Sequence, residues 1–172
     1  MKEIQLTEGI KAEVKGSTIA ISGKLGTNTR IFNDALVSIK VDGGKIVLDH
    51  TKEKKLVEKG MNAENALSKE IANDMKGVTQ HYELKMKSIH AHFPITVEVK
   101  GTVININNII GERVPRVAKI VGATKVEIKG QNVRLSGPSL DDVSQTAANI
   151  RKACVMRNKD TRVFQDGLYF EV

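Results

Sequence analysis

The sequence predicts an α+β protein with two tandem, duplicated domains, each a small, mainly antiparallel sheet packed against one main helix. Three observations predict this fold class. Short segments of alternating polar and apolar residues are separated by glycine-containing turns, each half of the chain contains one clear amphipathic helix, and a stretch of the first half resembles a stretch of the second. A chain of 172 residues suits two domains of about 85 residues each.

The resemblance between the halves lies in two predicted hairpins. KAEVKGSTIAISG (residues 11–23) and KVEIKGQNVRLSG (residues 125–137) are identical at six of 13 positions, and three further positions exchange one aliphatic residue for another. Both stretches predict strand, tight turn and strand, with Gly16 and Gly130 where the turn needs a positive φ. We expect the two hairpins to superpose as equivalent parts of a duplicated domain. The alternative is chance convergence of two hairpins.

The helix of the first half is predicted over residues 62–75. Asn62 is a suitable N-cap, and Gly77 can end the helix. An apolar residue recurs every four positions and predicts a buried stripe, made of Ala63, Leu67, Ile71 and Met75.

The helix of the second half is predicted over residues 139–154. Ser139 and Asp142 have the spacing of a capping box, and the basic pair Arg151 and Lys152 suits the negative end of the helix dipole. Cys154 lies on the apolar face, which predicts a small core residue rather than a nucleophile.

Strands are predicted for the remaining alternating segments, which are LVSIKV, KIVLDH, HYELKMKSIHAH, ITVEVK, TVININ, VRLSG, TRVF and LYFEV. The boundary between the domains is expected between residues 78 and 85. It separates an N-terminal α+β repeat, residues 1–82, from a C-terminal repeat, residues 83–172, expected to be the main RNA-binding domain.

The charge of the chain points to a polyanionic partner, such as nucleic acid or an acidic membrane surface. The formal net charge is +7 and the isoelectric point about 9.5. Residues 1–86 contain 14 Lys and Arg against 12 Asp and Glu, whereas residues 87–172 contain 13 against eight and include six of the seven arginines. Arginine can grip phosphate with two hydrogen bonds, so the second half is the better candidate for an RNA surface.

No motif of an enzyme is present. The sequence lacks a phosphate-binding loop, a dinucleotide-binding GxGxxG, a GxSxG and a CxxC pair, so we expect no catalysis, no cofactor and no small-molecule substrate. His90 and His92 would share one face of a strand, but no third ligand is evident, so no metal site is expected. A single cysteine, no signal-like leader and no long apolar run predict a cytoplasmic protein without a membrane span.

The basic residues of the second half gather around two predicted loop regions, IIGERVPRVAK and RKACVMRNKDTRVFQDG. Aromatic residues make up only 3% of the chain, so phosphate, sugar and shape contacts should dominate over base stacking. Asp166 and Gly167 predict a tight turn that approaches a partner, or simply a hairpin turn. A basic protein-interaction module is the rival hypothesis to RNA binding. The candidate RNA-binding residues are Arg113, Arg116, Lys152, Arg157, Asn158, Lys159, Arg162 and Gly167.

Three segments resemble the universal large-subunit ribosomal protein L-six family in its archaeal and eukaryotic branch. They are KGVTQHYELKMKSIHAHFPI, GERVPR and NKDTRVFQDGLY, and the last contains the pattern RxFxDGxY, here Arg162, Phe164, Asp166, Gly167 and Tyr169. The resemblance runs from about residue 8 to the C-terminus. The chain stops at Val172 without the basic tail of some relatives, so contacts of such a tail cannot be transferred.

The resemblance implies two α+β domains that arose by duplication and a structural, non-catalytic role in the large ribosomal subunit. It implies binding to large-subunit ribosomal RNA near the factor-binding region and the sarcin–ricin loop, chiefly through the C-terminal domain, with stabilisation of the RNA tertiary structure. Neighbouring ribosomal proteins and translation factors would be further partners. The alternative is a basic nucleic-acid-binding adapter that acts off the ribosome.

Overall fold

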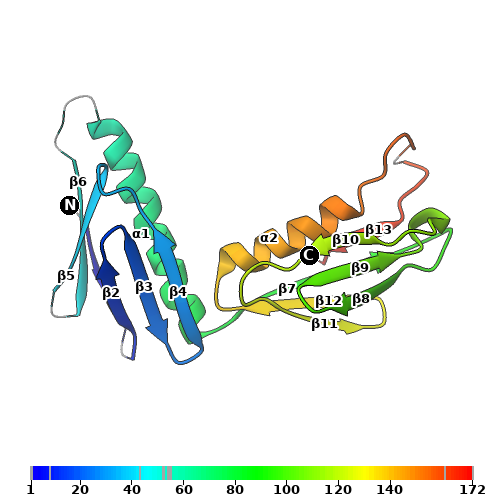
Figure 1. Ribbon diagram of the computed structural model, residues 1–172, viewed down its shortest axis with the longest axis horizontal. Coiled ribbons are helices and arrows are strands. Elements are labelled where there is room, and N and C mark those ends of the chain that lie inside the picture. The colour runs from blue at the N-terminus through cyan, green and yellow to red at the C-terminus, as the bar shows by residue number, and fades with distance from the viewer. Residues whose placement is uncertain are drawn as a thin grey trace. The chain divides into compact units, whose positions relative to one another are not determined.

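The chain divides into two compact units, residues 1–81 and 82–172, and each is described by itself (Figure 1). The computed structural model describes residues 2–7, 9–42, 44–51, 53, 56–160 and 162–171. Each unit contains one α-helix and small antiparallel sheets, so the predicted α+β class with a duplicated sheet-and-helix pattern is confirmed. Among the described residues, each unit has two sheets rather than the one predicted. No helix of the described residues is long and apolar enough to cross a membrane.

The N-terminal unit contains six described strands and helix α1. Two three-stranded sheets have the orders β1-β6-β5 and β2-β3-β4, and α1 packs against strands of both. The apolar faces meet in one core that includes Ile19, Ile21, Ile46, Leu48 and Ile71. The elements are β1 (Lys2–Gln5), β2 (Lys11–Lys15), β3 (Thr18–Gly23), β4 (Gly26–Ile31), β5 (Val37–Asp42), β6 (Lys45–His50) and α1 (Val57–Thr79).

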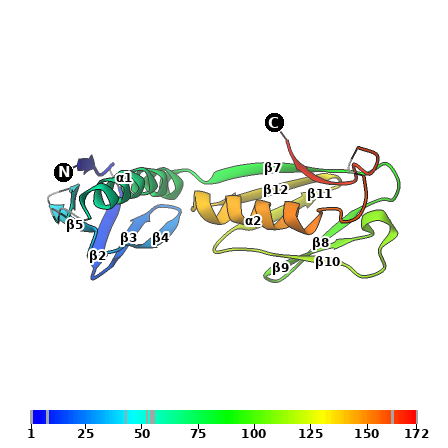
Figure 2. The ribbon, with the colours of Figure 1, turned by 90° about the horizontal axis from the view of Figure 1, so that it is seen from above.

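The C-terminal unit has a four-stranded sheet of order β11-β12-β7-β13 and a three-stranded sheet of order β10-β9-β8. Helix α2 runs between the strands of the two sheets (Figure 2) and contacts both of them. The core joins Met86, Ile104, Leu135, Val143 and Ile150. The elements are β7 (Tyr82–Ile89), β8 (Thr96–Lys100), β9 (Val103–Asn107), the 3-10 turn η1 (Ile109–Gly111), β10 (Arg116–Lys119), β11 (Lys125–Lys129), β12 (Asn132–Gly137), α2 (Leu140–Ala153) and β13 (Gly167–Phe170).

The two units share one topology, but the hairpins that look alike in sequence do not occupy equivalent places. In the N-terminal unit β5-β6-β1 and β2-β3-β4 correspond to β11-β12-β7 and β8-β9-β10 in the C-terminal unit, and β13 is an additional strand. The hairpin that directly precedes the helix is therefore β5–β6 in one unit and β11–β12 in the other. Ile46 and Leu48 match Val133 and Leu135, and all four are at most 1% exposed.

The expected superposition of the β2–β3 and β11–β12 hairpins as equivalent elements is thus wrong. Both do form the predicted hairpin with the same register, Lys11 opposite Ser22 and Lys125 opposite Ser136. Their shared glycines have φ of 58° at Gly16 and 61° at Gly130. The likeness reflects the same local turn chemistry, because a glycine relieves the cost of a positive φ wherever such a turn occurs.

Helix α2 matches the prediction closely, whereas α1 is longer than predicted. The Ser139 side chain accepts a hydrogen bond from the Asp142 N–H, as in the predicted cap. Helix α1 instead begins at Val57 and continues to Thr79. Asn62 and Gly77 are therefore internal residues and not its caps. Packing of the extra turns explains the extension, because Gly60 and Val78 are buried within α1.

Several strand predictions also need correction. Strands β1, β4 and β10 were not predicted, and the segment TRVF is not a strand in its described residues, Arg162 to Phe164; Thr161 lies outside them. His90 and His92 follow the end of β7 in a loop and so share no strand face. A hydrogen-bonded loop explains the ending of β7, since the Asp166 side chain accepts the N–H groups of Ala91 and His92.

A buried ion pair joins strand β4 to helix α1 in the N-terminal unit. Arg30 on β4 contacts Asp74 on α1 through its Nε and through its Nη2, the latter 3.1 Å from Asp74 Oδ1. The Asn28 amide donates to the same carboxylate at 3.1 Å. The side chain of Asp74 is 2% exposed, so the ion pair is buried. Arg30, the one arginine in the first half of the sequence, therefore has a structural role, because it connects β4 to α1.

Candidate RNA-binding surface

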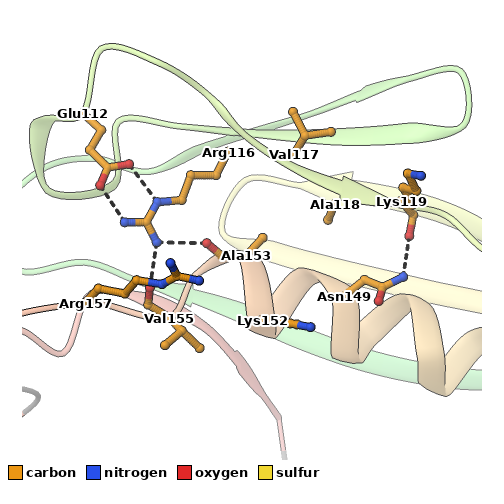
Figure 3. A pocket seen from close by; sticks show the side chains of 10 residues that line it. All are labelled: Glu112, Arg116, Val117, Ala118, Lys119, Asn149, Lys152, Ala153, Val155 and Arg157. Carbon is orange, nitrogen blue, oxygen red and sulfur yellow. Dashed lines mark hydrogen bonds and ion pairs between the residues drawn. The ribbon is translucent and has the colours of Figure 1, made fainter.

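A groove of about 660 Å³ in the C-terminal unit brings together three of the predicted RNA-binding residues, Arg116, Lys152 and Arg157 (Figure 3). It lies between β10 and the last turn of α2. Lys119 lines it as well, and Glu112 is the one acidic residue among the described lining residues. Four of the five described charged lining residues are cations, and a concave surface with such an excess favours a polyanionic ligand, because the converging positive charges reinforce one another there.

Arg116 is the structural strut of this groove rather than a free cation. Its Nε and Nη2 bind the two oxygens of Glu112 at 2.7 and 2.6 Å, and its Nη1 donates to the carbonyls of Ala153 and Val155, both at 2.9 Å. The hydrogen bonds from Arg116 hold the pKa of Glu112 below its usual value, against the effect of burial. The guanidinium thus donates hydrogen bonds to carbonyls at the C-terminus of α2 and connects β10 to the residues that end this helix.

We predict that replacing Arg116 lowers the stability of the protein and has little effect on the salt dependence of RNA binding. Arg116→Ala removes four hydrogen bonds and should lower the free energy of unfolding by about 1–3 kcal/mol. Arg116→Lys should restore less than half of the loss, since an ammonium cannot reproduce the planar fork. Urea unfolding followed by circular dichroism measures this. Unchanged stability of Arg116→Ala would contradict the role.

Besides Glu112, two polar residues of the groove, Lys119 and Asn149, are absent from the predicted set. Lys119 ends β10, and its carbonyl accepts a hydrogen bond of 3.0 Å from the Asn149 amide on α2. Asn149 and Lys152 are three residues apart on a helix, so they share a face. That spacing is the signal in the sequence that could have added Asn149 to the candidate residues. The packing of α2 against β10 could not be predicted, because β10 itself was not predicted.

The other predicted residues do not line the groove. Arg113 is exposed in the loop between η1 and β10. Asn158 is exposed with a φ of 58°, in the left-handed region that asparagine tolerates. Arg162 is 89% exposed and pairs with Asp160, whose carboxylate also accepts the Arg162 backbone N–H at 2.9 Å. These hydrogen bonds from Arg162 lower the pKa of Asp160.

A chain of contacts fixes the loop between α2 and β13. Lys159 Nζ lies 5.3 Å from the centre of the Phe164 ring, and that ring stacks on His92 with a centroid distance of 5.1 Å. His92 Nδ1 lies 3.2 Å from Asp166 Oδ1. The loop thereby presents its cations outward while its inner side is held by an aromatic stack and a buried carboxylate.

Asp166 and Gly167 do not form the predicted tight turn. Gly167 is the first residue of β13, opposite Ile89 on β7, and both Asp166 and Gly167 are buried. The aspartate side chain satisfies the backbone of the Ala91–His92 loop instead of making a turn of its own. The two residues therefore act on the surface indirectly, by anchoring the loops that form it.

Neither metal chemistry nor thiol chemistry gains support from the geometry. Among the described residues, no group of three or more His, Cys, Asp or Glu side chains could hold a metal ion. Cys154 is buried in the core of the C-terminal unit, and this burial raises the pKa of its thiol, so the neutral form is favoured. It is the core residue that the sequence predicted.

Known proteins similar to this chain agree on one family. A family model described as Ribosomal protein L6 matches residues 93–167. The large ribosomal subunit protein uL6 of Methanocella arvoryzae is 41% identical over 98% of this chain and 94% of its own length. The uL6 proteins of Archaeoglobus fulgidus and Thermoplasma acidophilum are 40% and 37% identical, each over 98% of this chain, and over 84% and 93% of their own lengths.

These relatives are archaeal, which confirms the predicted branch, and their names are those of ribosomal proteins rather than enzymes, which confirms the expectation of a non-enzymatic protein. Since the match extends over nearly the whole chain, both units are included. The chain belongs to the family of the large ribosomal subunit protein uL6.

Proposed function

We propose that this chain is a structural constituent of the large ribosomal subunit in the cytoplasm and binds large-subunit ribosomal RNA mainly through its C-terminal unit. The main support for this proposal is the basic groove in the C-terminal unit of a chain that belongs to the uL6 family. The family resemblance supports a position near the factor-binding region and the sarcin–ricin loop. Neighbouring ribosomal proteins and translation factors are further proposed partners.

The charges of the groove and of the adjoining loop support phosphate binding. Lys119, Lys152 and Arg157 line the groove, and Lys159 and Arg162 project from the loop that follows. Each exposed cation that neutralises a phosphate releases condensed counterions, which favours binding without reading the base sequence. Arg116 and Asp166 contribute by fixing the positions of these side chains.

The proposed role in the ribosome is to orient and stabilise folded RNA. Cations in a groove and on a fixed loop bind phosphates at set positions, so RNA segments that meet there are held in one arrangement. Co-sedimentation of the chain with large subunits in a cell extract tests this role. A chain that stays in the ribosome-free fraction would favour the alternative, a nucleic-acid-binding adapter that acts off the ribosome.

The loop cations should account for a large part of the salt dependence of RNA binding. If four or five phosphates are neutralised, log affinity should fall with log salt at a slope of roughly −3 to −4.5. Replacing Arg157, Lys159 and Arg162 together by Ala should flatten the slope by about two to three units. The measurement is filter binding of the full chain to transcribed large-subunit RNA at several salt concentrations.

A matched variant separates local contacts from overall charge. Lys11, Lys15 and Lys24 are exposed in the N-terminal unit, and replacing all three by Ala removes the same net charge. This control should leave the slope within about one unit of the parent value. Equal flattening by the two triple variants, with both folded, would overturn the assignment of RNA binding to the C-terminal unit.

A further inference from the structure

The outer face of the four-stranded sheet is not part of the proposed RNA-binding surface, which consists of the groove between β10 and α2 and the loop between α2 and β13. On its inner face Met86, Val133 and Leu135 are at most 1% exposed and pack in the core with α2. Side chains alternate between the faces of a strand, so their sequence neighbours point the other way. These neighbours are exposed and mostly charged, which leaves this face open to a partner.

The pairing register places four exposed residues of this face side by side. Lys129 on β11 is opposite Asn132 on β12, Asn132 is opposite Lys87 on β7, and Lys87 is opposite Tyr169 on β13. We call these four residues the row. Neighbouring strands lie about 4.8 Å apart, so the row crosses the sheet over roughly 14 Å.

The row contains two cations and no acidic residue, whereas the next line across the sheet contains acidic residues as well as the cations Arg134 and Lys85. In the next line across the sheet, Glu127 is opposite Arg134, and Arg134 also forms an ion pair with Glu83. Within the described part of the chain, the structure shows no ion pair for Lys87 or Lys129. Their charges are therefore available to an external anion.

The N-terminal unit shows that the fold does not require this charge. Its equivalent strands β5, β6 and β1 pair Asp42 with Lys45 and Lys45 with Gln5, at the positions that correspond to Lys129, Asn132 and Lys87. Those three residues have no net charge, and the same sheet forms. The two lysines of the C-terminal unit are thus not explained by folding.

Tyr169 adds a fixed aromatic surface at the end of the row. Tyr169 is 40% exposed, and its hydroxyl donates to the Gln165 carbonyl at 3.0 Å. A Cβ placed on Gly167 would lie 3.4 Å from Cε2 of the tyrosine ring, so the ring lies beside the backbone of this residue. The hydrogen bond fixes the hydroxyl end of the ring, which is favourable for stacking, because less conformational entropy is lost on binding.

We propose that the row is a second RNA contact of this chain, which binds a single-stranded or looped segment with Lys87 and Lys129 on phosphates and a base stacked on Tyr169. This inference rests on the proposed function and deepens it. Aromatic rings beside cationic residues are the combination that binds unpaired nucleotides. Tyr169 follows the loop of Lys159 and Arg162 directly in the chain, so the row extends that surface onto the sheet.

The charge of the row is tested with the full chain and transcribed large-subunit ribosomal RNA. The double variant Lys87→Gln, Lys129→Ala should flatten the salt slope by about 1.4 to 1.8 units and weaken binding roughly 20-fold near physiological salt. Its control is the double variant Lys125→Ala, Lys100→Ala. Lys125 lies on the same strand as Lys129 and faces the same side, and Lys100 pairs with Glu98 on β8. The control should change affinity less than threefold.

Stacking is tested separately from charge at Tyr169. Tyr169→Leu removes the aromatic ring and should weaken binding by roughly 5- to 150-fold at unchanged salt slope. Tyr169→Phe retains the ring and loses the bond to the Gln165 carbonyl, so its affinity should stay within about threefold of the parent value. Equal losses in the two variants, or none in Tyr169→Leu, would refute stacking. Circular dichroism of each variant establishes that it is folded.

The outcomes distinguish this inference from the proposed function. If the triple variant of the loop cations weakens RNA binding and the row variants do not, the row inference fails while the proposed function stands. If neither set weakens binding, both fail. If the row variants bind the RNA normally but enter large subunits less well, the face contacts a protein, and the inference is overturned.

Discussion

Asp74→Ala should lower the free energy of unfolding by about 3–5 kcal/mol, the largest effect we expect from a single substitution. The variant leaves the Arg30 guanidinium, whose side chain is only 16% exposed, without the buried carboxylate that it binds through two nitrogens. It also removes the acceptor of the Asn28 amide. For a unit of this size, such a loss corresponds to a fall in the melting temperature of at least roughly 12 °C.

Glu70 provides the matched control for Asp74. It lies on the same helix and contacts the same arginine at 3.3 Å, but its side chain is 45% exposed. Glu70→Ala should cost less than about 1 kcal/mol, because an exposed ion pair gains little over solvation of its members. Urea unfolding and calorimetry measure both variants. Equal losses at the two positions would show that burial does not determine the strength of this contact.

Asp166→Ala is expected to have the second largest effect, a loss of about 3 kcal/mol in the stability of the C-terminal unit. The side chain of Asp166 is fully buried and accepts the N–H groups of Ala91 and His92 at 2.9 and 3.3 Å, with His92 Nδ1 at 3.2 Å. Its loss should release both loops next to β13 and weaken RNA binding indirectly. Asp160→Ala, at an exposed carboxylate of the same loop, should cost much less stability than Asp166→Ala, because water solvates an exposed carboxylate well.

The contribution of Asp166 should also depend on pH. Burial raises the pKa of this carboxyl, but the hydrogen bonds from the Ala91 and His92 backbone and the His92 ring outweigh burial and bring it below the usual value. A lowered pKa in the folded state means that the stabilisation is complete above the unfolded pKa of about 3.9 and is lost as pH falls through the folded value. Asp166→Asn should therefore show a smaller loss of stability on acidification than the parent chain. Parallel pH profiles of the two proteins would contradict this.

Local signals in the sequence were sufficient for α2 and for both hairpins. The cap at Ser139, the alternating strands and the glycines at 16 and 130 act over a few residues, so their geometry does not depend on distant parts of the chain. Two further features were predicted from the sequence. The motif around Asp166 indicated the family, and the positive charge of the second half indicated the unit in which the cations gather.

The lining of the groove depended on tertiary structure. Arg116 and Arg157 were both candidates, but no sequence pattern distinguishes them. Arg116 binds the carbonyls of Ala153 and Val155 at the end of α2, whereas Arg157 is exposed. The difference arises because β10 pairs with β9 and packs against α2, contacts between residues far apart in the chain. The surrounding groups therefore determine whether an arginine forms hydrogen bonds within the protein or remains available to bind RNA.

The sequence by itself determined the fold class, the local hairpins and the family, because these follow from patterns over short stretches and from similarity along the chain. Only the tertiary structure decided which strands of the two units are equivalent, since equivalence depends on pairing between distant strands. Two alike hairpins, β2–β3 and β11–β12, lie at different places in the repeat, while β5–β6 and β11–β12 share a place with little sequence likeness. Turn chemistry fixes a hairpin locally, and burial of its apolar face against a helix fixes where the hairpin belongs.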